Sequence, residues 1–111
     1  MLRDLLGEEN ATVHLHDVAD VVCARLKVKL TELQSKRRIK NVAFARHVAM
    51  YLARNLTAHT LSEIGSHFGG KDHTTVLYAV EKIQDLVDRS PDTKVLIEDL
   101  KREARFKRAA R

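Results

Sequence analysis

The chain has 111 residues, of which 44% are hydrophobic and 32% charged, with a formal net charge of +5 and a single cysteine. This length suits one small domain with one core and is too short for a catalytic domain beside a separate binding domain. One cysteine excludes an internal disulfide. Because no apolar run reaches about 18 residues and the N-terminus lacks a signal-peptide layout, we expect a cytoplasmic protein.

The first third of the chain is predicted to be helical. The sequence has one proline and four glycines and shows no strict alternation of apolar and polar residues, so strands are hard to find and the fold class is predicted to be all-α. Apolar residues from Val18 to Leu26 form one helix face, which Asp17 could cap. A short helix is expected around residues 31–34.

Positive charge is concentrated in the middle of the chain. Residues 1–34 carry a net charge of −2, residues 35–79 carry +5 and residues 80–111 carry +2. Residues 35–41 show no helical periodicity and are predicted to form an exposed loop. This loop holds four cations: Lys36, Arg37, Arg38 and Lys40. Such groups can neutralise phosphates, and an arginine can enter a narrow minor groove, where the potential is most negative. A solvated basic turn without a partner remains the alternative.

The longest helix is predicted to start at Asn41, as its cap, and to run to about Leu56. Its buried face is expected to consist of residues spaced three and four apart, namely Val42, Ala45, Val48, Ala49, Leu52, Ala53 and Leu56. Arg46, His47 and Arg54 fall away from that face.

Two further helices, separated by a glycine turn, are predicted next, and together they form a helix-turn-helix. Thr60 and Glu63 match a capping box, which starts a helix that Gly69-Gly70 would end. Asp72 could cap the next helix, expected to run to about Ser90. In a helix-turn-helix the second helix places its N-terminal residues against base edges in the DNA major groove.

The first turn of that second helix carries side chains suited to base edges. His73 can donate to guanine, Thr74 offers a methyl and a hydroxyl group, and Asp72 can accept from the amino group of cytosine. The alternative is that Asp72 is only a cap and His73 only a surface histidine.

The C-terminal third is predicted to hold one more helix. Ser90 can cap it and Pro91 suits its first position, with Val95, Leu96 and Leu100 on its apolar face. The segment from residue 101 to the end has six basic residues and one acidic residue. No order is predicted for the end of this segment.

Nucleotide binding, metal or enzyme chemistry, and RNA or protein binding are the alternatives to DNA binding. Residues 65–72 match a phosphate-binding P-loop in their glycines and lysine, but they follow a helix and end in an aspartate where a hydroxyl is needed. The six histidines lack zinc-ligand spacing, and no nucleophile or carboxylate pair is apparent, so no metal, cofactor or enzyme activity is expected. An RNA-binding or protein-docking bundle stays open, although the few aromatic residues lie mostly at apolar helix positions.

The sequence resembles the C-terminal DNA-binding domain of DnaA, the bacterial chromosomal replication initiator. The resemblance covers about residues 16–100 and is carried by four segments in the same order: Leu33 to Arg38, Arg46 to Arg54, Leu61 to Gly65, and Gly69 to Val76, which matches the family's signature. It implies a Trp-repressor-like helix-turn-helix bundle of about six helices that binds DnaA boxes, short asymmetric A/T-rich sites at the replication origin.

The resemblance also implies roles for individual residues. Asp72, His73 and Thr74 match the positions that read bases in the major groove, and Arg38 matches the minor-groove arginine. Backbone-contacting positions are matched by Lys40, Arg46, His47, Arg54, Thr57, Lys71 and Thr75. Lys36, Arg37, Ser62 and Tyr78 are also predicted to contact DNA phosphates. Departures from the usual pattern are His47 in place of a glutamine, Lys71 in place of an arginine and Ser62 in place of a proline, and they concern individual phosphate contacts.

A division of the chain follows from the resemblance. Residues 1–15 are expected to be the end of a linker helix from a preceding ATPase domain, residues 16–100 the DNA-binding domain, and residues 101–111 a basic tail. ATP and magnesium would belong to the ATPase domain. The expected partners are double-stranded DNA, the rest of the initiator and, weakly, acidic phospholipid, with a monomeric, nucleoid-associated domain. A free-standing paralogue that regulates replication or transcription remains the alternative.

Overall fold

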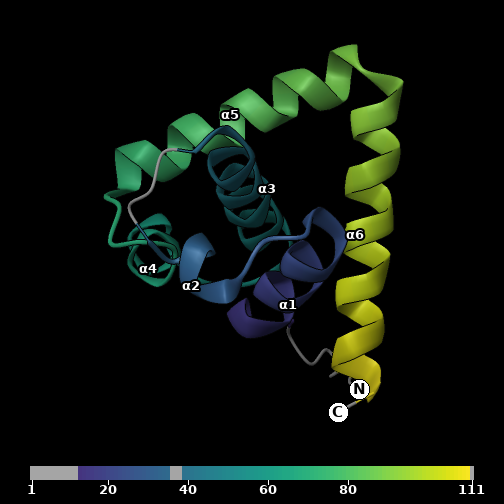
Figure 1. Cartoon of the computed structure of the whole chain (residues 1–111), viewed down its shortest axis with the longest axis horizontal. Helices are drawn as coiled ribbons and strands as arrows, with labels where there is room; N and C mark the ends of the chain where they lie inside the picture. Colours follow the sequence, from purple (N-terminus) through teal and green to yellow (C-terminus); the bar gives the residue numbers. More distant parts are fainter. Residues whose placement is uncertain (1–12, 36–38, 111) are drawn as a thin grey trace.

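The computed structural model describes residues 13–35 and 39–110, and this part of the chain folds into six helices without a strand (Figure 1). The helices are α1 (Leu15–Leu26), α2 (Leu30–Leu33), α3 (Lys40–Leu56), α4 (Leu61–His67), α5 (His73–Arg89) and α6 (Pro91–Ala110). The prediction of an all-helical fold with about six helices is confirmed.

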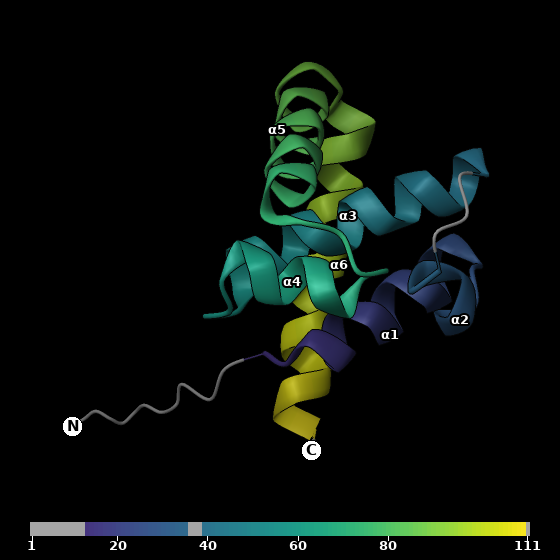
Figure 2. The ribbon, with the colours of Figure 1, turned by 90° about the vertical axis from the view of Figure 1, so that its left-hand side faces the viewer.

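Helix α3 is the centre of the bundle and packs against each of the other five helices. Alanines at four-residue spacing, Ala45, Ala49 and Ala53, are fully buried on it, and their small side chains let neighbouring helices approach closely. Helix α5 lies across α3 in both ribbon views (Figures 1 and 2). The Tyr51 hydroxyl donates to Gln84 Oε1 at 2.7 Å and links the two helices.

Helix α6 turns back from the end of α5 and runs beside α1 (Figure 1). Arg25 of α1 pairs with Asp99 at 3.2 Å and with Glu103 at 3.1 Å on α6. Ile97, Leu100 and Ala104 are buried on the inner face of α6. Helix α6 continues to Ala110, so the segment for whose end no order was predicted is helical over its described part, and its Ala104 belongs to the core.

The caps of α4 and α6 lie where they were predicted. The Glu63 N–H donates to the Thr60 hydroxyl at 3.1 Å, and the Thr60 N–H donates to the Glu63 carboxylate at 2.8 Å. The Ser90 hydroxyl accepts from the Thr93 N–H at 3.2 Å, with Pro91 in the first position of α6. These bonds satisfy backbone donors that a helix cannot satisfy internally.

Two predicted helix starts were wrong. Helix α1 is capped by His14, and Asp17 is its third residue, which accepts from the His14 N–H at 2.9 Å. Helix α3 is capped by Ile39, whose carbonyl accepts from the Ala43 N–H at 2.8 Å, so Asn41 lies inside the first turn. In both cases the first backbone hydrogen bond begins before the side chain that was predicted to cap it.

One predicted core position was also wrong. Val95 is 59% exposed, whereas Ile97 is 1% exposed, because the packing of α6 against both α1 and α5 rotates its buried face away from Val95. None of the described helices combines the length and the apolar character that crossing a bilayer would require.

Candidate nucleic-acid interface

The corner between α4 and α5 depends on three glycines. Gly69 and Gly70 have φ values of 97° and 67°, which are left-handed backbone conformations that glycine adopts at little cost. Gly65 allows a close approach, because a Cβ at this position would lie 2.1 Å from the Lys71 carbonyl oxygen. The Lys71 N–H donates to the Gly65 carbonyl at 2.9 Å, which fixes the chain as it enters α5.

The corner packs against the end of α2. A Cβ on Gly69 would lie 2.7 Å from the Ser35 carbonyl oxygen, so the glycine turn and Ser35 are in direct backbone contact. Ser35 immediately precedes the cationic run of the sequence. The predicted contacts of Lys36, Arg37 and Arg38 lie outside the described residues.

Asp72 caps α5, as the sequence predicts. Its Oδ1 accepts from the Thr75 N–H, the Thr75 hydroxyl and the Thr74 hydroxyl, each at 2.9 Å. The backbone hydrogen bond from Thr75, followed by the two hydroxyl bonds, lowers the pKa of the Asp72 carboxyl to about 2. The carboxylate is therefore ionised at neutral pH and can only accept hydrogen bonds.

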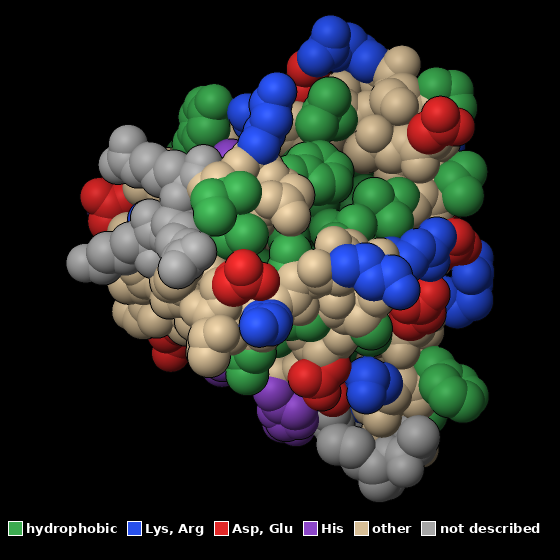
Figure 3. Space-filling view, viewed as in Figure 1, with side chains coloured by type: hydrophobic (Ala, Val, Ile, Leu, Met, Phe, Trp, Pro, Cys, Tyr) green, Lys and Arg blue, Asp and Glu red, His purple; other side chains and the backbone are tan. Residues whose placement is uncertain are grey.

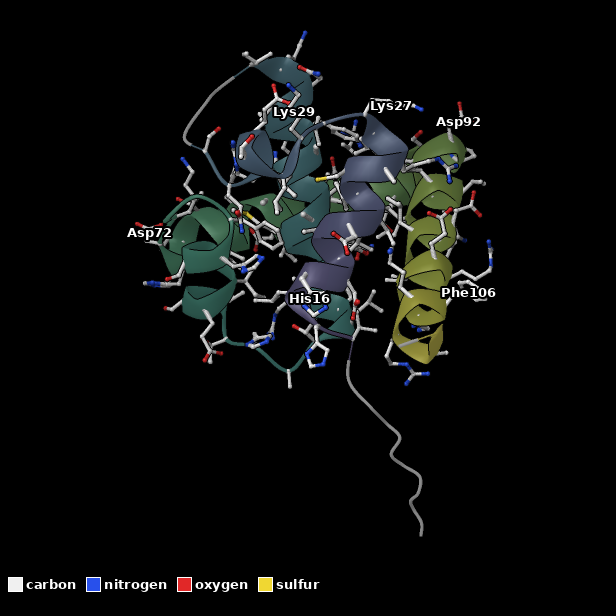
Figure 4. All side chains as sticks on the ribbon, turned by 60° about the horizontal axis from the view of Figure 1, so that its bottom comes forward. His16, Lys27, Lys29, Asp72, Asp92 and Phe106 are labelled. Carbon is white, nitrogen blue, oxygen red and sulfur yellow. The ribbon has the colours of Figure 1, made fainter. Side chains whose placement is uncertain are left out.

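The three predicted base-reading side chains form one exposed tip. Asp72, His73 and Thr74 are all exposed at the start of α5. In Figure 4 Asp72 lies at the opposite edge of the molecule from Asp92 and Phe106 on α6. The tip is thus presented away from the part of the fold where α6 packs on α1.

Five of the predicted backbone-contacting residues line one hollow beside this tip: Arg46, His47, Lys71, Thr75 and Tyr78. They come from the middle of α3, from the turn before α5 and from the first two turns of α5, and we call the space between them the α3–α5 hollow. The rings of His47 and Tyr78 meet edge to face at 6.1 Å. Since the Thr75 hydroxyl already donates to Asp72, the other possible side-chain donors that line this space belong to Arg46, His47, Lys71 and Tyr78.

A second hollow adjoins the first and adds a cation that the sequence analysis missed. It is lined by Lys40, Phe44, His47 and Lys82, together with Ala43, which also lines the α3–α5 hollow. Lys82 lies one helical turn after Tyr78, with its Nζ 5.8 Å from the ring centroid. The four-residue spacing along α5 was the available signal, since it places both side chains on one helix face.

Arg46 does not fall away from the buried face of α3, and that prediction was wrong. The residue is 5% exposed. Its Nε donates to the Leu33 carbonyl at 3.0 Å and its Nη2 to the Glu32 carbonyl at 3.1 Å. The guanidinium thus satisfies carbonyls at the C-terminal end of α2, where a positive charge also interacts favourably with the helix dipole.

Replacing Arg46 by Ala is expected to lower the free energy of unfolding by about 1.5–3 kcal/mol, because hydrogen bonds that involve a charged group contribute this much. Urea unfolding followed by circular dichroism measures the change. Arg54→Ala on the same helix is the matched control, since Arg54 is exposed and its loss should stay within about 0.5 kcal/mol. Equal effects of the two substitutions would contradict the structural role of Arg46.

Three predicted contact residues lie apart from both hollows. Arg54 and Thr57 are at the C-terminal end of α3, where the Thr57 hydroxyl donates to the Ala53 carbonyl at 2.7 Å. Ser62 lines a separate hollow beside His59 and His67. Within residues 13–35 and 39–110, no group of three or more histidine, cysteine or acidic side chains has an arrangement that could hold a metal ion.

The surface along α6 has a different character from the α3–α5 hollow. Basic and acidic side chains alternate along this edge in the space-filling view (Figure 3). Several of them are paired, since Arg102 lies 3.0 Å from Asp99, and Lys107 lies 3.9 Å from Asp20. Part of the positive charge of α6 is therefore balanced within the protein.

Comparisons with known proteins match the same part of the chain. The model of the family described as the bacterial DnaA protein helix-turn-helix matches residues 15–83. The chromosomal replication initiator protein DnaA of Rickettsia akari (strain Hartford) is 42% identical over 88 residues, which are 79% of this chain and 19% of that relative. The chain thus spans about a fifth of the length of the relative it matches.

Proposed function

Because the chain belongs to the family of bacterial DnaA helix-turn-helix domains, we propose that it binds double-stranded DNA sequence-specifically, at DnaA boxes. The observation that carries the proposal is the position of the exposed α5 tip (Asp72, His73 and Thr74) next to a hollow lined by cations from α3 and from the turn before α5. Base-reading and phosphate-binding groups are needed side by side for such recognition.

In the proposed complex the N-terminal end of α5 enters the major groove. His73 donates to guanine O6 or N7, and Asp72 accepts from a cytosine amino group. All hydrogen bonds that Asp72 receives within the described part of the chain reach Oδ1, so Oδ2 is the atom that accepts from the base. The α3–α5 hollow holds a backbone phosphate at the edge of the groove.

We also propose that this domain directs a replication initiator to the origin. The function of the matched relative as a replication initiator is stated in its name, and the ATP-dependent steps expected of such a protein would lie outside this chain. A free-standing regulator with the same domain would bind the same DNA, so the distinction depends on the rest of the protein.

A titration of two labelled duplexes tests the proposed function. One duplex carries a DnaA box and the other a scrambled sequence, and each is measured at two salt concentrations. We expect the affinity for the cognate duplex to exceed that for the scrambled duplex by a factor on the order of a thousand. Both affinities should fall as the salt concentration rises. Equal affinities for the two duplexes at both salt concentrations would exclude sequence-specific binding.

Replacing Lys71 by Met is expected to weaken binding to both duplexes by a similar factor and to reduce the slope of log K against log salt by about one, since one phosphate contact is lost. Lys94→Met is the matched control. Lys94 is exposed near the start of α6, beyond the far end of α5, which is 17 residues or about 25 Å long. An unchanged salt slope in Lys71→Met would contradict the proposed phosphate contact.

A further inference from the structure

His47 occupies a distinctive place between the two hollows, because it lines both of them. The charged groups around it are Arg46 and Lys40 on α3, Lys82 on α5 and Lys71 in the turn before α5, with the Tyr78 ring in edge contact. None of the residues that line the two hollows, all in the described ranges, carries a carboxylate. Such a surface is suited to an anion.

The free protein favours the neutral form of the His47 imidazole. Burial lowers the pKa of His47 below its usual value, and the charges of Lys82 and Arg46 lower it further. An anion in the hollow would act in the opposite direction, because an opposite charge within about 4–6 Å stabilises the protonated form of a histidine. The protonation state of His47 is thus sensitive to whether the hollow is filled.

On the basis of the DNA binding proposed above, we infer that a DNA backbone phosphate seated in the α3–α5 hollow binds His47 in its protonated form, so that binding takes up a proton. The bound imidazolium is both a charge partner and an N–H donor for the phosphate. A histidine thereby makes the affinity of this domain for DNA dependent on pH near neutrality.

The direction of the pH dependence follows from the two protonation equilibria. Below the pKa of the free protein, His47 is charged in both states and the affinity is highest. Between the pKa values of the free and the bound protein, the affinity falls by up to about tenfold per pH unit as pH rises, because a proton must be taken up with the DNA. Above the pKa of the complex the affinity is constant again.

His47→Gln tests this coupling, because glutamine keeps an N–H donor but cannot be protonated. Affinity for the cognate duplex is measured from about pH 5.5 to 8.5, and calorimetry in two buffers of different ionisation enthalpy gives the number of protons taken up. We expect the unmodified chain to lose about five- to tenfold more affinity over this range than His47→Gln and to take up as much as one more proton. Proton uptake by groups other than His47 is common to both proteins and cancels in the comparison.

His16→Gln is the matched control, since the side chain of His16 is 62% exposed on α1, outside both hollows, and it should retain the proton uptake of the unmodified chain. A readout without any variant is the titration of the His47 ring by NMR, in which the pKa should be higher in the complex than in the free protein. Identical proton uptake by His47→Gln and the unmodified chain, or an unchanged His47 pKa on binding, would overturn the inference. If the cognate and scrambled duplexes bind equally at every pH, the proposed function itself fails.

Discussion

Replacing His73 by Ala is expected to weaken binding to the cognate duplex by about 1–3 kcal/mol, or roughly 5- to 150-fold, and to leave binding to the scrambled duplex almost unchanged. The side chain is exposed at the start of α5 and is available to donate to guanine. Fluorescence anisotropy on both duplexes at one salt concentration measures the two effects.

The comparison between duplexes is the part of this experiment that decides the role of His73. Loss of a residue that contributes only electrostatic attraction would weaken the affinity for both duplexes alike. Equal losses of affinity would therefore contradict the role of His73 in reading bases. His59→Ala is a suitable control, because His59 is a partly exposed histidine before α4 that pairs with Glu63 at 3.4 Å. Its loss should change neither affinity by more than about twofold.

Replacing Gly65 by Ala is expected to destabilise the fold by about 3 kcal/mol, at the upper end of the usual cost of overpacking. The new Cβ would lie 2.1 Å from the Lys71 carbonyl oxygen, a backbone atom that can move only if the turn before α5 moves. Because this turn carries Lys71 and Asp72, both duplexes should bind more weakly. Urea unfolding and duplex titration of the same preparation measure both consequences.

Gly70→Asn is the control for the Gly65 experiment. A Cβ on Gly70 would meet no atom within 4 Å, and its φ of 67° lies in a region that asparagine tolerates better than other side chains. The free energy of unfolding of Gly70→Asn should therefore differ from that of the unmodified chain by less than about 1 kcal/mol. If Gly65→Ala were as stable as Gly70→Asn, the close approach of α4 to the turn would not be essential to the corner.

Several features that depend on residues within one turn of each other could be predicted from the sequence, although the starts of α1 and α3 were misplaced. The reciprocal cap of Thr60 and Glu63 and the cap of α5 by Asp72 involve partners three residues apart. Such pairs are set by local backbone geometry, which the residue types reveal. The exposed tip of α5 follows from these local signals.

Features that depend on contacts between distant segments could not be predicted in this way. Helical periodicity assigned Arg46 to an exposed face, but the carbonyls it binds belong to α2, 13 and 14 residues earlier. Lys82 joins the hollow only because α5 lies across α3, and Gly65 is required only because the Lys71 carbonyl approaches it. In each case the partner is specified by tertiary packing.

The resemblance supplied what periodicity could not for the α3–α5 hollow. It singled out Arg46, His47, Lys71 and Thr75, which the structure brings together. It did not separate them from Arg54 and Thr57, which lie at the C-terminal end of α3. A set of matched positions therefore contains residues with different surroundings, and their individual roles have to be measured one at a time.

The bonds received by Asp72 restrict which bases can face Thr74. Since the ionised carboxylate can only accept, the Thr74 hydroxyl must direct its hydrogen toward Asp72 Oδ1. The hydroxyl oxygen then presents lone pairs outward, which match the exocyclic amino groups of adenine and cytosine and repel the carbonyl oxygens of guanine and thymine. In the proposed complex, the cap of α5 thus fixes the polarity with which the neighbouring threonine meets the DNA.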